Sequence, residues 1–109
     1  MREYEFRWYD TDVKSIGIKT MKYDDEKQVR LEALEIFKNC KCPHVGITSF
    51  DNDYWFSEII ECINGNYAVV KASLEVTMGG GHPMDYSILK PDGSTGRKVT
   101  RRYFWKVNE

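Results

Sequence analysis

A two-residue turn signal, Asn64-Gly65, determines much of what this 109-residue chain can fold into. Both residue types accept the positive φ angles of a type I′ turn, which joins two antiparallel strands. The register that follows pairs Ile63 with Asn66, Ile60 with Val69, Ile59 with Val70, Glu58 with Lys71 and Trp55 with Leu74. Apolar residues then face apolar residues and an acid faces a base, so hydropathy and charge favour the same hairpin.

Residues 25–39 have the apolar spacing of an α-helix. Their apolar stripe consists of Val29, Ala33, Ile36, Phe37 and Cys40, widened by Leu31 and Leu34. Asp25 and Gln28 have the spacing of a capping box, in which the carboxylate accepts a hydrogen bond from the third helical N–H. Asn39 suits a left-handed position at the C-terminal end, and Pro43 prevents the helix from resuming. Charged residues, Arg30 among them, are expected on the solvent side.

The other segments alternate between apolar and polar residues, as strands do. Tyr4, Phe6 and Trp8 alternate with charged residues. Residues 15–23 have a thin apolar content, which predicts either an edge strand or a strand covered by the aromatic residues of the first strand. Further strands are expected at 45–50, 86–89 and 97–107. The sequence predicts an α+β fold in a single domain over residues 1–109. In this fold, one helix (about 25–39) packs on a mainly antiparallel sheet of five to seven strands, in the order β-β-α-β-β-β-β-β.

Overall composition excludes several classes of protein. The formal net charge is −1, so bulk charge recruits neither nucleic acid nor a membrane. The first residues carry charges where a signal peptide is apolar, and no uncharged stretch is long enough to span a bilayer. Three cysteines cannot form a self-contained disulfide framework. We therefore expect a soluble protein of the cytoplasm that has no membrane partner.

No motif indicates catalysis, a metal or a cofactor. Cys40, Cys42 and His44, with Cys62 or His82 as a fourth ligand, would suit zinc, but a Cys-x-Cys pair is tighter than the usual spacing. The glycines before His82 are not followed by the helix that a phosphate loop needs. The paired aspartates lie in predicted turns or at the helix cap. We expect no metal, no cofactor and no enzymatic activity.

Charge is distributed unevenly along the chain, since residues 1–66 carry a net −4 and residues 90–109 a net +4. On a strand over 97–107, Lys98, Arg102 and Lys106 share a face with Phe104. The candidate partner-binding residues are Arg97, Lys98, Arg101, Arg102, Phe104 and Lys106. Such a face could track a phosphate backbone or enter an acidic groove on a protein. The alternative is a solvated edge whose charges prevent aggregation.

The 15 aromatic residues are too many for the space beneath one short helix. Some should lie exposed on the second sheet face, as a surface for a partner or for self-association. The sequence thus favours a non-enzymatic interaction module that binds and modulates or inhibits a larger protein or nucleoprotein. In size and charge it is similar to the accessory proteins of phages and mobile elements. The alternatives are a direct RNA or single-stranded DNA binder and, third, a small nuclease.

Overall fold

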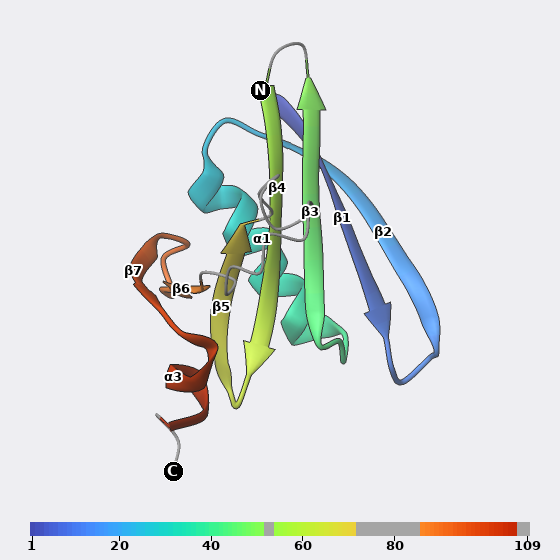
Figure 1. The fold of residues 1–109 in the computed structure, drawn as a ribbon. Coiled ribbons are helices and arrows are strands. Elements are labelled where there is room, and N and C mark those ends of the chain that lie inside the picture. Colours follow the sequence, from blue (N-terminus) through green and yellow to red (C-terminus); the bar gives the residue numbers. More distant parts are fainter. Residues whose placement is uncertain (52–53, 72–85, 107–109) are drawn as a thin grey trace, which may run out of the picture.

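The computed structural model describes residues 1–51, 54–71 and 86–106, and shows one helix packed on a single antiparallel sheet (Figure 1). The elements are β1 Arg2–Asp10, β2 Ser15–Tyr23, α1 Glu26–Asn39, β3 His44–Asp51, β4 Tyr54–Ile63, β5 Asn66–Lys71, β6 Tyr86–Leu89, β7 Thr95–Val99 and α3 Arg101–Lys106. The predicted α+β fold, with its helix at about 25–39 and its antiparallel sheet, is confirmed.

The hairpin at Asn64-Gly65 has the predicted register. Asn64 and Gly65 have φ angles of 51° and 81°, as a type I′ turn requires. Ile63 pairs with Asn66, Ile60 with Val69, Ile59 with Val70 and Glu58 with Lys71. The predicted pair Trp55–Leu74 lies outside the described residues, because residues 72–85 are not described. The loop at 78–83 falls in the same segment.

The seven strands follow the order β2-β1-β3-β4-β5-β6-β7, and all neighbours are antiparallel. The nine-residue β2 is therefore an edge strand, as its thin apolar content predicts. The alternation in β1 is also confirmed, since Tyr4 and Phe6 are buried.

Helix α1 begins and ends differently from the prediction. The Asp25 carboxylate accepts from the Lys27 N–H at 3.0 Å rather than from Gln28, whose N–H bonds to the Asp25 carbonyl. The helix ends at Cys40 in extended conformation, so Asn39 does not take a left-handed position; its side chain donates to the Glu35 carbonyl instead. The inward face also differs, because Arg30 is buried and Leu31 is 38% exposed.

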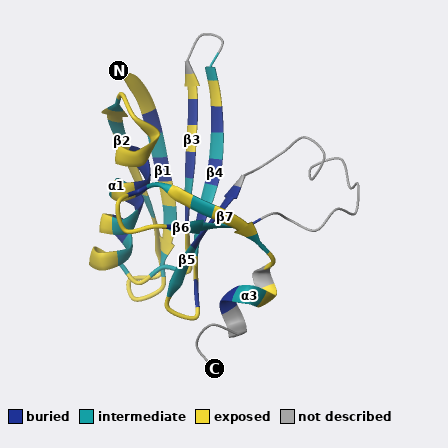
Figure 2. Cartoon of the chain, turned by 90° about the vertical axis from the view of Figure 1, so that its left-hand side faces the viewer, coloured by how far each residue is buried: buried dark blue, intermediate teal, exposed yellow. Residues whose placement is uncertain are grey.

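Each sheet face has its own hydrophobic cluster, and Figure 2 shows α1 and α3 on opposite sides of the sheet. Beneath α1, Val29 and Ala33 pack against Phe6, Ile47 and other residues of β1, β3 and β4. The second cluster consists of Ile63, Ala68, Val70, Tyr86 and Phe104, with Tyr103 packed against it.

The predicted strand over 97–107 is wrong. Strand β7 stops at Val99, and residues 101–106 form the short helix α3. The Tyr103 N–H bonds to the Thr100 carbonyl at 3.0 Å, which closes the first turn. A helical turn brings the adjacent residues Tyr103 and Phe104 to one cluster, whereas a strand would point them to opposite faces. Burial of two neighbouring aromatic rings therefore favours the helix.

Replacement of Gly65 by Ala tests the turn. The positive φ of 81° at Gly65 strains any residue with a Cβ, so we expect the free energy of unfolding to fall by about 1 kcal/mol. Gly46→Ala is the matched control, because a Cβ there would meet only the Arg7 carbonyl oxygen, at 3.8 Å. Denaturant titration of both variants measures the difference. Equal stability of the two variants would contradict the turn assignment.

Candidate interaction surface

Among the described residues, no helix covers one face of the sheet over β2, β1, β3 and the start of β4. Helix α1 lies on the opposite face, and α3 packs against the cluster around β5 and β6. We call this uncovered area the open face. Side chains alternate along each strand, so the register assigns to this face Glu3, Glu5, Arg7, Tyr9, Ile16, Ile18, Thr20, Lys22, Thr48, Phe50, Trp55 and Ser57.

At one end of the open face, two large aromatic side chains are exposed. Phe50 and Trp55 stand opposite each other across β3 and β4, and are 82% and 58% exposed. They border a hollow of about 430 Å³, which Glu3, Glu5, Thr20, Thr48 and Ser49 also line. Aromatic side chains of this size are enriched at the energetic centres of protein interfaces. This aromatic end can receive a side chain between its rings and its carboxylates.

At the other end, three side chains of β1 and β2 expose apolar surface. Ile16 and Ile18 are 70% and 58% exposed, and Tyr9, which pairs with Ile16, is 44% exposed. The nearby Val13, in the loop between the strands, is 66% exposed. Single exposed apolar residues are ordinary on protein surfaces, but a contiguous group is typical of an interaction site. We call these residues the isoleucine end.

The large number of aromatic residues predicts that some lie exposed on the second sheet face, and Phe50 and Trp55 are such residues. That number does not indicate which aromatic residues are exposed. The register of β3 and β4, which pairs Phe50 with Trp55, puts both residues on one face. Nothing in the sequence shows that α1 covers the other face, and that choice decides which residues are exposed.

The predicted basic site is divided between two elements. Arg97 and Lys98 are exposed on β7, and Arg102 is exposed on α3. Phe104, predicted to be exposed among them, is 1% exposed and packs against Tyr86, so it offers no ring to a base. The Arg97 guanidinium instead lies 5.2 Å from the centre of the Tyr103 ring. The side chains of Arg101 and Lys106 lie outside the described part.

The Cys and His residues do not form a ligand cluster within the described residues, where no group of three potential ligands could hold a metal. Burial raises the pKa of the Cys42 thiol to about 11, and nearby Cys40, Asp10 and Cys62 add to the shift. Such a thiol stays protonated at neutral pH and is a poor nucleophile. His44 is exposed and lies opposite Glu61 in the register of β3 and β4. His82 is outside the described residues.

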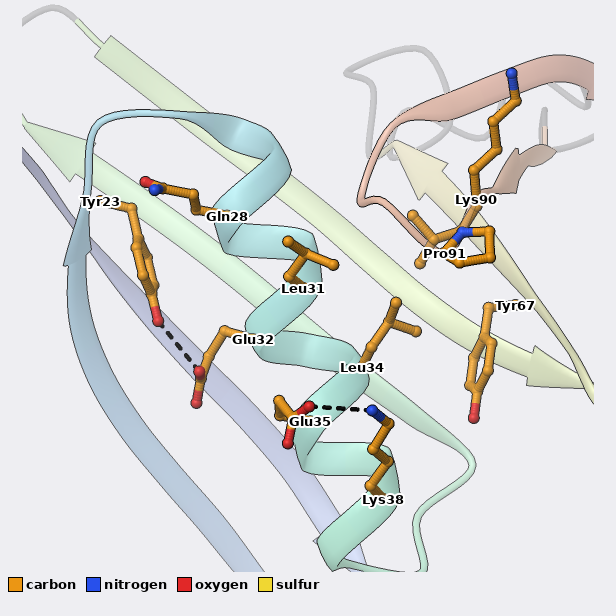
Figure 3. A pocket seen from close by; sticks show the side chains of 11 residues that line it. Tyr23, Gln28, Leu31, Glu32, Leu34, Glu35, Lys38, Tyr67, Lys90 and Pro91 are labelled. Carbon is orange, nitrogen blue, oxygen red and sulfur yellow. Dashed lines mark hydrogen bonds and ion pairs between the residues drawn. The ribbon is translucent and has the colours of Figure 1, made fainter.

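An open groove of about 600 Å³ runs beside α1 (Figure 3). Its apolar lining includes Leu31, Leu34, Tyr67 and Pro91. Its polar lining includes the ion pair of Lys38 with Glu35 at 3.1 Å and the Tyr23 hydroxyl, which donates to Glu32 at 3.1 Å. The groove offers apolar contact area and no residue set for catalysis.

The most buried charges join α1 to β4. The Arg30 guanidinium donates from Nη2 to Glu58 Oε1 at 2.7 Å and from Nε to Oε2 at 3.0 Å, and both side chains are buried. Arg30 Nη2 also donates to Glu26 at 3.2 Å, and Glu26 accepts from the Tyr54 hydroxyl at 3.3 Å. Burial raises the pKa of Tyr54, and its contacts with Tyr4 and Glu26 add to the shift. The residues satisfy one another, which is typical of a structural network.

Comparison of the chain with protein-family models, with curated proteins and with solved structures finds no match. The described helices are also too short and too polar to cross a membrane. The proposed function therefore rests on the exposed side chains of the open face.

Removal of one partner from the buried ion pair should destabilise the fold strongly. In Arg30→Met the Glu58 carboxylate stays buried without its partner, so we expect a loss of about 3–5 kcal/mol in the free energy of unfolding. Lys38→Met, which breaks the exposed pair with Glu35, should lose less than about 1 kcal/mol. The double variant Arg30→Met/Glu58→Leu should recover much of the loss. Denaturant titration that gave equal losses for Arg30→Met and Lys38→Met would contradict this role.

The raised pKa of Cys42 predicts slow alkylation. We compare two single-cysteine variants, Cys40→Ser/Cys62→Ser and Cys40→Ser/Cys42→Ser, which leave Cys42 and the exposed Cys62 respectively. With iodoacetamide at pH 8, Cys42 should react on the order of tenfold more slowly, because less of it is thiolate. Its rate should still rise as the pH approaches about 11. Equal rates at pH 8 would show that Cys42 is not shielded.

Proposed function

We propose that this chain is a non-enzymatic interaction module that binds a larger protein through its open face. The observation that carries the proposal is the exposure of Phe50 and Trp55, at 82% and 58%, on a sheet face that no described helix covers. Burial of such rings in a partner pocket would remove a large apolar surface from water.

The charges around the rings favour a protein over a nucleic acid. Glu3 and Glu5 line the same hollow as Phe50 and Trp55. Glu5 pairs with Arg7, whereas Glu3 forms no such ion pair among the described residues, so a phosphate would meet the Glu3 carboxylate there. A basic protein surface would meet both the rings and the carboxylates favourably, since cations bind aromatic faces and carboxylates alike. Modulation or inhibition of a nucleic-acid-binding protein is consistent with this preference. We also propose the cytoplasm as its compartment, because three cysteines cannot form a complete set of disulfides.

Direct binding of RNA or single-stranded DNA is the second candidate. The observation that favours it is a set of exposed basic side chains, those of Arg97, Lys98 and Arg102, beside the half-buried Tyr103. The burial of Phe104 weakens it, because the predicted stacking ring is not available. The first candidate uses the exposed rings on β3 and β4, and the second uses the basic side chains on β7 and α3. Substitutions in each region therefore distinguish the two candidates.

The double variant Phe50→Ser/Trp55→Ser tests the first candidate. We expect the immobilised parent chain to retain a protein from nuclease-treated extract of its own cells, and the double variant to retain at least about tenfold less. Leu31→Ser is the control, because Leu31 is exposed on α1, on the other side of the sheet. Denaturant titration checks that all three chains are folded, since the large losses of stability come from changes in the buried core and none of these side chains belongs to it.

Undiminished retention by the double variant would contradict the open-face proposal. Loss of all retention after nuclease treatment, together with loss in Lys98→Ser/Arg102→Ser, would favour the nucleic-acid candidate. Sedimentation velocity of the parent chain identifies a third outcome, in which the partner is a second copy.

A further inference from the structure

The outer edge of β2 is the longest unpaired strand edge among the described residues. Strand β2 spans nine residues and pairs only with β1, whereas the opposite edge strand, β7, spans five. Figure 1 shows β2 as the outermost strand on its side, with no described element beyond it. An edge of this kind presents backbone donors and acceptors to another extended segment.

The register shows which backbone groups are presented. In a two-residue hairpin the closing pair, Ile63–Asn66, is hydrogen-bonded, and bonded pairs then alternate along an antiparallel ladder. The pairings β4–β5, β3–β4, β1–β3 and β1–β2 continue without a shift in register. Across these ladders, the alternation directs the backbone N–H and C=O groups of the odd-numbered residues of β2 toward β1. The N–H and C=O groups that point outward belong to Ile16, Ile18, Thr20 and Lys22.

An independent hydrogen bond agrees with this alternation. The same alternation directs the backbone N–H and C=O groups of the odd-numbered residues of β1 toward β3. Just beyond β1, the Thr11 N–H donates to the Lys41 carbonyl at 2.8 Å, and Lys41 leads into β3. The backbone therefore follows the expected parity up to the end of the strand.

Strand β2 itself contributes basic and apolar side chains to this edge, and Lys22 lies opposite Glu3 in the register of β1 and β2. Strand β2 contains Lys19 and Lys22 and no acidic residue. Lys19 Nζ lies 2.5 Å from Glu32, and the Lys19 side chain is still 44% exposed. On the open face, Ile16 and Ile18 extend apolar surface to the edge. A strand that joined this edge would gain most from apolar residues beside the isoleucines and acidic residues beside the lysines.

We propose that β2 accepts an extended, acidic segment of the partner protein as an additional strand of the sheet. This inference rests on the proposed function and names the form in which the partner binds. Main-chain hydrogen bonds to the outward groups would supply affinity, and the alternating side chains would supply selectivity. A second copy of this chain fits poorly, because it would bring the lysines of two β2 strands into one ribbon.

Amide hydrogen exchange with synthetic peptides tests the proposal. The probes are peptides as long as β2, 9 residues, one alternating Glu and Val and one alternating Lys and Val. In the free chain the outward amides of Ile16, Ile18, Thr20 and Lys22 should exchange fast, and those of Gly17, Lys19 and Met21 slowly. The Glu–Val peptide should slow the outward amides by at least about tenfold, and the Lys–Val peptide should not. No slowing by the Glu–Val peptide, or equal slowing by both, overturns the proposal.

Thr20→Pro is compared with Thr20→Val, because both variants change the side chain that Thr20 contributes to the open face and only proline also removes the backbone N–H at the edge. Proline at this position removes an outward donor and leaves the hydrogen bonds to β1, so the sheet should persist. We expect Thr20→Pro to abolish the effect of the Glu–Val peptide, and Thr20→Val to preserve it. If Thr20→Pro unfolds the chain, Lys19→Gln/Lys22→Gln replaces it and should weaken peptide binding at least about fivefold.

The same variants distinguish failure of this inference from failure of the proposed function. If Thr20→Pro, or its replacement, still retains the partner protein whereas Phe50→Ser/Trp55→Ser does not, the open face binds without strand addition. If all of them retain it, both proposals fail. Concentration-dependent dimers of the parent chain that Thr20→Pro abolishes would assign the edge to a second copy and overturn the inference.

Discussion

The ion pair between Arg30 and Glu58 determines how α1, the longer of the two described helices, sits on the sheet. Two charges that are 6% and 2% exposed are tolerable only if their hydrogen bonds are satisfied, and the bidentate geometry satisfies them. Because Arg30 is fixed on α1 and Glu58 on β4, the pair allows one rotation of the helix about its axis. That rotation turns Val29, Ala33 and Ile36 inward and leaves Leu31 partly exposed.

The position of α1 accounts for the uncovered surface. A helix of 14 residues can cover one face of a few strands, and α1 lies over β1, β3 and β4. On the opposite face, Tyr103 and Phe104 of α3 pack on a cluster formed by residues of β4 to β7. The two described helices are too short to cover the whole sheet, so among the described residues nothing covers one face of β2, β1 and β3. The open face and the edge of β2 are both left by this placement of the described helices.

Local signals in the sequence predict most of the strands. The turn residues Asn64-Gly65 determine the register of β4 and β5, and alternation predicts β1 and β2, because each signal depends on neighbours in the chain. The strand expected over 97–107 ends at Val99, because the residues that follow are also compatible with a short helix. No local pattern indicates that Tyr103 and Phe104 would meet one cluster, since Ile63 and Val70 of that cluster lie far away in the chain.

The partner of Glu58 and the candidate surface depend on tertiary structure in the same way. Register correctly pairs Glu58 with Lys71, yet the buried partner of its carboxylate is Arg30, 28 residues away and expected on the solvent side. The abundance of aromatic residues indicated that some rings would be exposed. Which rings are exposed depends on the face that α1 covers, and no pattern within a single strand carries that information.

The arrangement of charges restricts how one partner can engage the molecule. Strand β2 is separated from the exposed Arg97 and Lys98 of β7 by six strand spacings, roughly 29 Å along the sheet at about 4.8 Å each. The carboxylates of Glu3 and Glu5 line the hollow between them, beside Phe50 and Trp55. A single phosphate strand that reached from one basic edge to the other would cross these carboxylates. A folded protein can instead present an acidic segment to β2 and a cationic side chain to the hollow, because its own surface varies in charge over this distance.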